Sequence, residues 1–255
     1  ENWAFANIAN QLVANLSSFY DFTIIPTEVV ENISQVLMMT QEYDITHFFW
    51  RESLRLIYDS HYINYNLGLG YSPEQYADTY LKNRVISSSV YDHLFLSDDE
   101  IAKRYDFYNS LITAYTVSSS KLWDIYSQIS SYPKPTTLAE DGVDLAKFYP
   151  KNLERFIDVN DRTLVIGWAG NSKWAAEKED FKGYNTLLKP AVEILQQEGM
   201  KIELCIADRQ LGFIPHDDMV EYYNKIDLYV CPSKIEGTPN PVLESMACGV
   251  PVIST

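Results

Sequence analysis

Residues 226–255 read IDLYVCPSKIEGTPNPVLESMACGVPVIST, and the interpretation of the whole chain starts from this stretch. It predicts a short apolar strand, a loop rich in Pro and Gly, a helix that ends at Gly249, and a second strand. Asn240 is expected to cap the helix and Pro241 to be its first residue. A helix N-terminus that follows a strand and a loop presents free N–H groups and a positive dipole end, so the stretch predicts a phosphate site.

Two carboxylates frame this predicted phosphate site. Glu236 lies in the loop and Glu244 lies inside the helix, with seven residues between them. Alone, an acidic first turn indicates only a stable helix, because acidic side chains favour helix N-termini. The whole stretch, including residues 246–253, resembles the Glu-x7-Glu motif of retaining GT-B glycosyltransferases of glycosyltransferase family 4. The resemblance implies that the motif binds a nucleotide-sugar donor.

Composition narrows the class of protein. The chain has 255 residues, of which 46% are hydrophobic and 22% charged, which is typical of one large or two ordinary globular domains. No apolar run reaches membrane-spanning length and no signal peptide opens the sequence, so we expect a cytoplasmic protein with reduced cysteines. The net charge of −15 argues against nucleic acid as a partner. Peripheral membrane contact through a local basic patch stays open.

Helical periodicities alternate with short apolar strands along the first part of the chain, which predicts a parallel sheet with helices on both faces. Residues 51–84 have no clear assignment beyond a helical segment at 73–81. The loop-rich segment with Pro133, Pro135, Gly142 and Pro150 is the predicted domain boundary. We expect helices at 3–16, 29–40, 98–109 and 121–129, and strands at 22–25, 43–50, 84–90 and 111–119.

The second part of the chain repeats the alternation. We expect strands at 163–167 and 201–207, and helices at 184–198 and 217–225. The resemblance covers most of the chain and implies an α/β fold of the GT-B class, with two Rossmann-like domains whose parallel sheets face an interdomain cleft. Residues 1–145 would form the acceptor-side domain and residues 146–255 the nucleotide-sugar-binding domain. Compared with the resembled family, the first βα unit and the C-terminal part are expected to be absent.

The resemblance also implies roles for single residues. Lys182 precedes Gly183 in the position of the family's diphosphate-binding lysine, although most lysines are simply solvated surface residues. His93 follows a strand, where family members carry a His near the donor sugar; an ordinary histidine is an equally good interpretation. Glu236 would bind sugar hydroxyls and Glu244 ribose hydroxyls. The remaining donor-binding candidates are Asn240, Val242, Leu243, Gly170 and Lys173.

The turn after the second strand of this domain departs from the family pattern. Asp208 and Arg209 stand where the family has a glycine-containing turn, which weakens any prediction of the contacts to the nucleotide base. No cluster of His, Cys or acidic residues has metal-ligand spacing, so we expect neither a catalytic metal nor a cofactor.

The function predicted from the sequence is retaining, metal-independent transfer of a hexosyl group from a nucleoside diphosphate sugar. The acceptor would be a glycan or a lipid-linked molecule, with polysaccharide biosynthesis as the setting. Two alternatives stay open: a nucleotide-sugar-binding module without transfer activity, and a GT-B sugar-nucleotide epimerase, which would need no acceptor.

Overall fold

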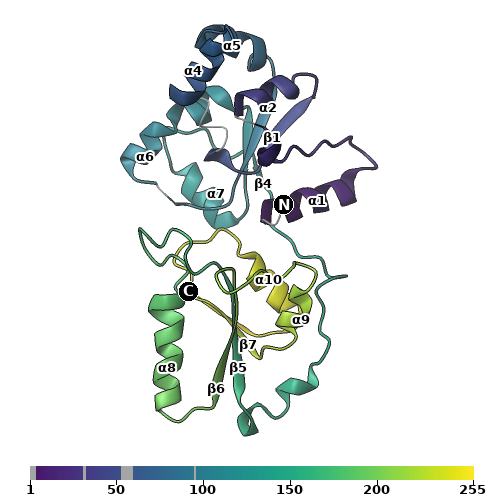
Figure 1. Ribbon diagram of the computed structural model, residues 1–255, viewed down its shortest axis with the longest axis vertical. Coiled ribbons are helices and arrows are strands. Elements are labelled where there is room, and N and C mark those ends of the chain that lie inside the picture. The colour runs from purple at the N-terminus through teal and green to yellow at the C-terminus, as the bar shows by residue number, and fades with distance from the viewer. Residues whose placement is uncertain (1–3, 31–32, 53–59, 95) are drawn as a thin grey trace. The chain divides into compact units, whose positions relative to one another are not determined.

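The computed structural model describes residues 4–30, 33–52, 60–94 and 96–255 and divides into two compact units, Glu1–Ala139 and Glu140–Thr255 (Figure 1). In the described residues each unit contains a four-stranded parallel sheet with helices. The sequence analysis placed the boundary between residues 145 and 146. In the structure the two units divide between Ala139 and Glu140, and Val143 already packs against the apolar core of the second unit.

The sheet of the first unit follows chain order, β1-β2-β3-β4, and all of its described pairings are parallel. Its strands are β1 (Ile45–Phe48), β2 (Val85–Val90), β3 (Ala114–Val117) and β4 (Thr137–Leu138). The described helices are α1 (Ala4–Leu16), α2 (Ile33–Met39), α4 (Ser60–Gly68), α5 (Pro73–Tyr80), α6 (Asp98–Lys103) and α7 (Ser120–Ser127), with a 3₁₀ turn at Thr27–Val29 and a π-helical turn at Phe107–Leu111.

The core of the first unit lies on one face of this sheet. Alternate strand residues such as Phe48, Ile86 and Tyr115 are buried there against α2, α5 and α7. On the other face Ile45 and Val85 are 60% and 42% exposed. Because successive strand residues point to opposite faces, the alternation identifies the core face directly.

Two elements predicted for the first unit differ in the structure. The strand predicted at 22–25 is wrong: Phe22 and Ile24 lie in irregular chain and are 42% and 49% exposed, and no strand among the described residues pairs with them. The helix predicted at 98–109 is interrupted, since α6 ends at Lys103 and a π-helical turn follows at Phe107–Leu111. Parts of the helices predicted at 3–16 and 29–40, namely residues 3 and 31–32, lie outside the described residues.

The second unit has the strand order β6-β5-β7-β8, again with all described pairings parallel. Its strands are β5 (Leu164–Gly170), β6 (Ile202–Asp208), β7 (Leu228–Cys231) and β8 (Val252–Ser254). Its α-helices are α8 (Lys189–Gln197), α9 (Met219–Tyr223) and α10 (Asn240–Ala247), with 3₁₀ turns at Glu154–Phe156 and Val159–Asp161 and a π-helical turn at Tyr184–Leu188 before α8. The two central strands, β5 and β7, are neighbours although β6 separates them in the chain, which is the doubly wound order of a Rossmann-like sheet.

Helices cover both faces of this second sheet, with α8 on one side and α9 and α10 on the other (Figure 1). Strand β5 shows the division. Ile166 and Trp168 pack towards α8, whereas Val165 and Ala169 pack with the α9 and α10 side chains. The strand therefore reads as a continuous apolar run, as expected for a parallel strand buried on both faces.

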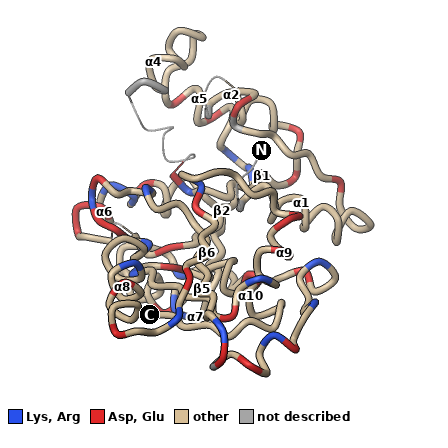
Figure 2. The backbone as a smooth tube through the Cα atoms, turned by 60° about the horizontal axis from the view of Figure 1, so that its bottom comes forward, with Lys and Arg blue, Asp and Glu red and all other residues tan. Residues whose placement is uncertain are grey.

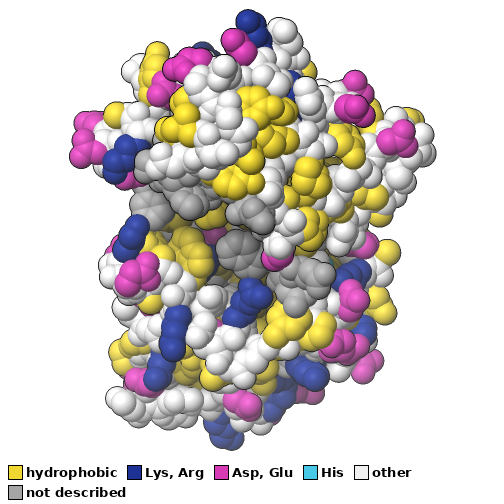
Figure 3. Space-filling view, turned by 45° about the horizontal axis from the view of Figure 1, so that its top comes forward, with side chains coloured by type: hydrophobic (Ala, Val, Ile, Leu, Met, Phe, Trp, Pro, Cys, Tyr) yellow, Lys and Arg dark blue, Asp and Glu magenta, His cyan; other side chains and the backbone are white. Residues whose placement is uncertain are grey.

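Charged residues are spread over both units. Acidic and basic positions are interspersed along the backbone of each (Figure 2). On the face shown in Figure 3, Lys and Arg side chains lie singly or in small groups among acidic and apolar ones, without one continuous basic patch. Among the described residues, no helix is both long and apolar enough to cross a membrane.

Candidate functional site

The loop after β7 carries Glu236 and leads into α10. Pro239 takes the N-cap position, so the prediction that Asn240 caps the helix is wrong; the first intrahelical hydrogen bonds end on the Pro239 carbonyl, and Asn240 is the first helical residue. The Val242 and Leu243 N–H groups both donate to that carbonyl, at 2.9 and 3.4 Å. Asn240, Val242 and Leu243 were all predicted to bind the donor substrate. Of their three backbone N–H groups, only that of Asn240 has no hydrogen-bond partner among the described residues.

Lys182 and Glu236 form an ion pair, with 2.6 Å between Nζ and Oε1. Both side chains remain about a quarter exposed, at 27% and 26%, so a ligand can reach either group. The Lys182 ammonium also lies 5.4 Å from the centre of the Trp174 ring. The loops that carry the pair are joined by a hydrogen bond from the Lys234 N–H to the Phe181 carbonyl, 2.9 Å long. The structure thus brings together two of the three predicted catalytic residues.

Gly183 makes this approach of the two loops feasible. Its φ of +65° lies in the left-handed region that favours glycine. A Cβ atom there would lie 2.0 Å from the Pro232 carbonyl oxygen, which is too close for any side chain. Directly after it, the Asn185 and Thr186 N–H groups donate to Asp180 Oδ2, both at 2.9 Å, and this fixes the start of the following helical turn.

Glu244 lies inside α10 and is 8% exposed. Its two carboxylate oxygens accept hydrogen bonds from different partners: Oε1 from His216 Nε2 at 2.8 Å and Oε2 from the Tyr223 hydroxyl at 2.7 Å. Burial raises the pKa of Tyr223 well above its ordinary value, and the Glu244 charge raises it further, so the phenol stays protonated and donates. A carboxylate has about four acceptor positions, which leaves Glu244 capacity for two further hydrogen bonds.

His216 is itself held from its other side. Its Nδ1 lies 2.9 Å from Lys147 Nζ, and Lys147 pairs with Asp217 at 2.5 Å. The His216 ring also packs on Phe148, with 5.3 Å between ring centres. Sequence reasoning missed His216, Lys147 and Tyr223, because their partners are far away in the chain and no periodicity links them. We call the contacts among Lys147, His216, Glu244 and Tyr223 the Glu244 network.

Gly170 ends β5, and Lys173 follows in the next turn. A Cβ on Gly170 would lie 2.9 Å from the Trp168 indole, so the position disfavours a side chain. Lys173 is exposed, and its backbone N–H donates to Asn171 Oδ1. The buried Asp208, at the end of β6, organises this turn by accepting from the N–H groups of Ser172 and Gln210, both at 3.1 Å. These residues and Glu236 follow carboxyl ends of parallel strands, the edge where open α/β sheets bind ligands.

His93, the third predicted catalytic residue, belongs to the first unit and follows β2. Its Nδ1 atom is buried and has no hydrogen-bond partner among the described residues. Burial lowers the pKa of His93, the nearby Lys121 lowers it further, and Asp92 opposes the change. The ring is therefore neutral near pH 7, with a nitrogen free to interact. Its role in catalysis stays a prediction.

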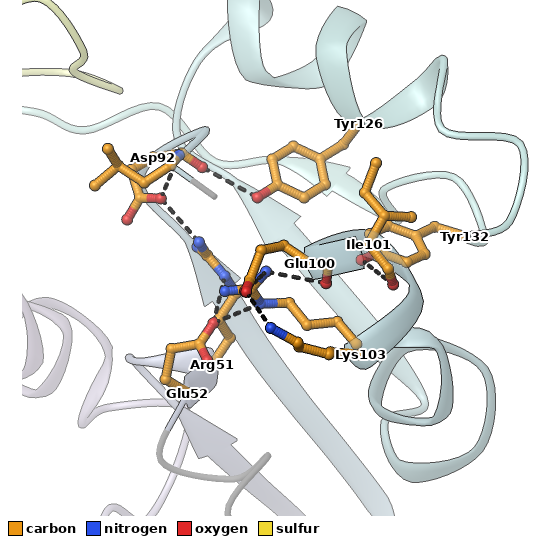
Figure 4. Close-up of polar contacts among 10 residues, drawn as sticks. Arg51, Glu52, Asp92, Glu100, Ile101, Lys103, Tyr126 and Tyr132 are labelled. Atoms are coloured by element: carbon orange, nitrogen blue, oxygen red, sulfur yellow. Dashed lines mark hydrogen bonds and ion pairs between the residues drawn. The ribbon is translucent and has the colours of Figure 1, made fainter. Parts of the chain in front are cut away.

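A cluster of opposite charges includes Asp92, the residue that precedes His93 in the chain (Figure 4). Arg51 pairs with Asp92 at 2.8 Å and with Glu52 at 3.3 Å. Arg104 pairs with Glu52 at 2.7 Å and with Glu100 at 3.3 Å. Both guanidinium groups are almost completely buried. We call these five residues the arginine cluster; sequence analysis did not single out any of them.

The described residues contain no group of three or more His, Cys, Asp and Glu side chains arranged to hold a metal ion. A depression of about 470 Å³ on the second unit lies against β6 and α9, with the apolar residues Cys205, Ile206 and Ile214 in its lining. It contains none of the predicted site residues. We therefore place the candidate site at the carboxyl edge of the sheet instead.

The fold is that of the GT-B class, with two Rossmann-like parallel sheets. Sucrose-phosphate synthase from Thermosynechococcus elongatus resembles the chain with a TM-score of 0.51 and 16% identity, over 91% of this chain and 62% of that one. HepE from Anabaena, solved with UDP and glucose, gives a TM-score of 0.53 and 15% identity over 87% and 61% of the two chains. At such low identity the likeness shows the fold alone.

Sequence comparison adds information about the second unit. Residues 163–255 match the family model described as glycosyl transferases group 1. O-antigen chain mannosyltransferase B from Escherichia coli is 44% identical over 45 residues, which are 18% of this chain and 12% of that protein. The chain thus spans only a small part of this relative and less than two thirds of the two solved structures. The family match therefore concerns the second unit, residues 163–255, and the structural likeness concerns the GT-B fold.

Proposed function

We propose that the protein transfers a hexosyl group from a nucleoside diphosphate sugar to a glycan or lipid-linked acceptor, with retention of the anomeric configuration and without a catalytic metal. The observation that carries the proposal is the Lys182–Glu236 pair beside the start of α10. It places an accessible cation and an accessible carboxylate at the ligand-binding edge of a Rossmann-like sheet. The group 1 match over the same residues supports the proposal.

In this mechanism the chain neutralises the departing diphosphate, on which negative charge grows as the glycosidic bond breaks. Lys182 supplies a full positive charge and the N-terminus of α10 adds about half a charge, with the Asn240 N–H as a donor. Lys182 leaves Glu236 for the diphosphate, and Glu236 then accepts hydrogen bonds from the sugar hydroxyls. Because both groups are already paired, binding exchanges one set of charged contacts for another.

Glu244 binds the ribose in this proposal. Its two remaining acceptor positions suit two neighbouring hydroxyl groups, and its internal hydrogen bonds hold the carboxylate in place. Gly170 and Lys173 complete the donor site at the turn after β5. The acceptor is a glycan or a lipid-linked molecule, as in polysaccharide biosynthesis, and contact with a membrane surface belongs to the same proposal. The cytoplasm is the expected compartment.

A direct test begins with a thermal-shift screen of the protein against UDP, GDP and ADP and their hexose conjugates, because a ligand well above its Kd raises the melting temperature. Turnover with an acceptor mixture, followed by NMR assignment of the new anomeric centre, tests transfer and retention. Donor binding without turnover would instead favour a binding module. Conversion of the donor without any acceptor would favour an epimerase, and the absence of nucleotide binding would refute the proposal.

A further inference from the structure

The Glu244 network contains a histidine whose proton can be placed by elimination. Lys147 Nζ is an ammonium group that only donates, so the Nδ1 atom of His216, 2.9 Å away, must be the acceptor. The proton of the neutral ring then sits on Nε2, which faces Glu244 Oε1 at 2.8 Å. The lysine therefore fixes the tautomer in which the histidine donates to the carboxylate.

We propose that His216 and Lys147 are positioning residues of the donor site: Lys147 sets the tautomer of His216, and His216 orients the Glu244 carboxylate towards the ribose. The inference rests on the proposed function, since it assigns Glu244 a ribose to bind. Its basis is the arrangement of contacts, in which the neutral donors His216 and Tyr223 each occupy one carboxylate oxygen. The remaining acceptor position on each oxygen is then fixed in direction, as two adjacent hydroxyl groups require.

Neutral donors matter for this role. A cation in direct contact with Glu244 would compensate its charge, whereas a neutral imidazole and a phenol orient it and leave the charge for the ligand. The positive charge of Lys147 stays one residue removed, where the exposed Asp217 partly balances it. Lys147 lies in the first residues of the second unit, so this segment is connected to Glu244 through His216.

The experiment measures the affinity of the protein for UDP and for 2′-deoxy-UDP by calorimetry, with the corresponding GDP pair in parallel. Wild type should bind the ribonucleotide roughly tenfold more tightly or better, as expected for a hydrogen bond to a charged group. His216→Asn keeps a polar group near Lys147 but removes the donor to Glu244. It should lose about tenfold in UDP affinity and most of the preference for ribose over deoxyribose.

His216→Gln places an amide nitrogen near the Nε2 position. This variant should keep the UDP affinity and the preference for ribose over deoxyribose. Lys147→Met should reduce the ribose preference, because the free ring can adopt either tautomer. Lys151→Met is the matched control: Lys151 lies on the same segment and pairs with Glu221, which is not a member of the network. Urea unfolding of each variant verifies that the fold is intact, and the Lys147 variant provides the test if His216→Asn does not fold.

Two results would overturn the inference while leaving the proposed function intact. In the first, the His216→Asn variant and wild type show equal affinity and equal ribose preference. In the second, the Asn and Gln variants lose the same affinity, which would indicate a purely structural histidine. If wild type binds none of these nucleotides, the proposed function fails and this inference fails with it.

Discussion

Carboxylates gather at the carboxyl edge of the sheet in both units, but their partners differ. In the arginine cluster of the first unit, each carboxylate pairs with a guanidinium group, and Glu100 also pairs with Lys103. In the Glu244 network of the second unit, the donors that the described residues supply to the buried carboxylate are the His216 imidazole and the Tyr223 phenol. In the first arrangement every carboxylate contacts a cation directly, whereas in the second the cation of the network, Lys147, is separated from Glu244 by His216.

This difference helps to distinguish charged residues that stabilise the fold from charged residues that bind a ligand. Burial alone would lower the pKa of Arg51, but the neighbouring Tyr126, Asp92 and Tyr108 raise it above its ordinary range, so the guanidinium stays charged and depends on its partners. Such a cluster holds elements together and is costly to break. The following predictions test the distinction, from the largest expected effect to the smallest.

Asp92→Asn should destabilise the protein by about 3–5 kcal/mol, because it leaves the buried Arg51 with Glu52 as its remaining carboxylate partner. Urea unfolding at pH 7 measures the change. Asp99→Asn is the control, since Asp99 is an exposed residue in the first turn of α6 and should cost less than about 1 kcal/mol. The folded variant should bind nucleoside diphosphates as wild type does; weakened binding would contradict a purely structural role for the cluster.

Lys182→Ala should lower kcat by about a hundred- to a thousandfold, because the charge that Lys182 meets grows in the transition state. The loss of affinity should be larger for UDP than for UMP, which lacks the distal phosphate. Lys201→Ala, at an exposed lysine of the same unit, is the control. Equal losses for both nucleotides, or none for either, would mean that Lys182 is an ordinary surface lysine.

Glu244→Ala should weaken UDP binding by about tenfold or more, which corresponds to roughly 1.5–3 kcal/mol for a hydrogen bond to a charged group. It also leaves the His216 and Tyr223 donors without their acceptor, so the free energy of unfolding should fall. Calorimetry and urea unfolding on the same preparation separate the two effects. Unchanged UDP affinity in a folded variant would remove Glu244 from the donor site.

His93→Ala tests whether the edge of the first sheet takes part in function beside its arginine cluster. We expect lower turnover with nearly unchanged nucleoside diphosphate affinity, because His93 is predicted to act on the sugar and not on the nucleotide. Its buried Nδ1 atom has no hydrogen-bond partner among the described residues and could therefore bond a ligand. Steady-state kinetics and calorimetry give the two quantities, and unchanged turnover would exclude the role.

The smallest effect is expected at His47 on β1. Both ring nitrogens bond serine hydroxyls, to Ser87 at 2.9 Å and Ser89 at 3.0 Å, although much of the ring faces solvent. Enclosure of the nitrogens lowers the pKa of His47 to about 4. Between pH 6.5 and 4 the unfolded chain therefore binds a proton that the folded chain does not, so stability falls as the pH is lowered. His47→Gln should flatten this part of the pH profile in urea unfolding; an unchanged slope would contradict the assignment.

The sequence predicted those strands whose position depends on the local pattern of apolar residues. The strands β1, β2, β3, β5 and β6 overlap their predicted ranges, and β7 and β8 lie in the stretch 226–255 where two strands were predicted. Apolar runs between Gly and Pro breaks carry that signal. Residues 22–25 show its limit. They are as apolar as a buried strand, but whether an apolar run pairs depends on a neighbour that local sequence does not specify.

The residues of the candidate site also fall into two groups, those that the sequence predicted and those that it did not. Lys182, Glu236 and Glu244 were found through the resemblance of their surrounding motif. His216 and Lys147 contact one another across 69 residues, and Tyr223 reaches Glu244 across 21, so no spacing rule could connect them. One signal was present in hindsight: a buried carboxylate needs donors, and His216 and Tyr223 are polar residues near the helix that packs against α10.

Gly183 has a consequence for anyone who wishes to change the specificity of this protein. Its left-handed backbone and its closeness to the Pro232 carbonyl tie the position of Lys182 to the loop that carries Glu236. A saturation library at position 183 should return glycine almost alone, since every other residue would push the two loops apart. Substitutions at Lys182 and Glu236 are therefore expected to be coupled, and libraries that vary the proposed donor site are better directed at the loop between Ser233 and Pro239 with Gly183 held constant.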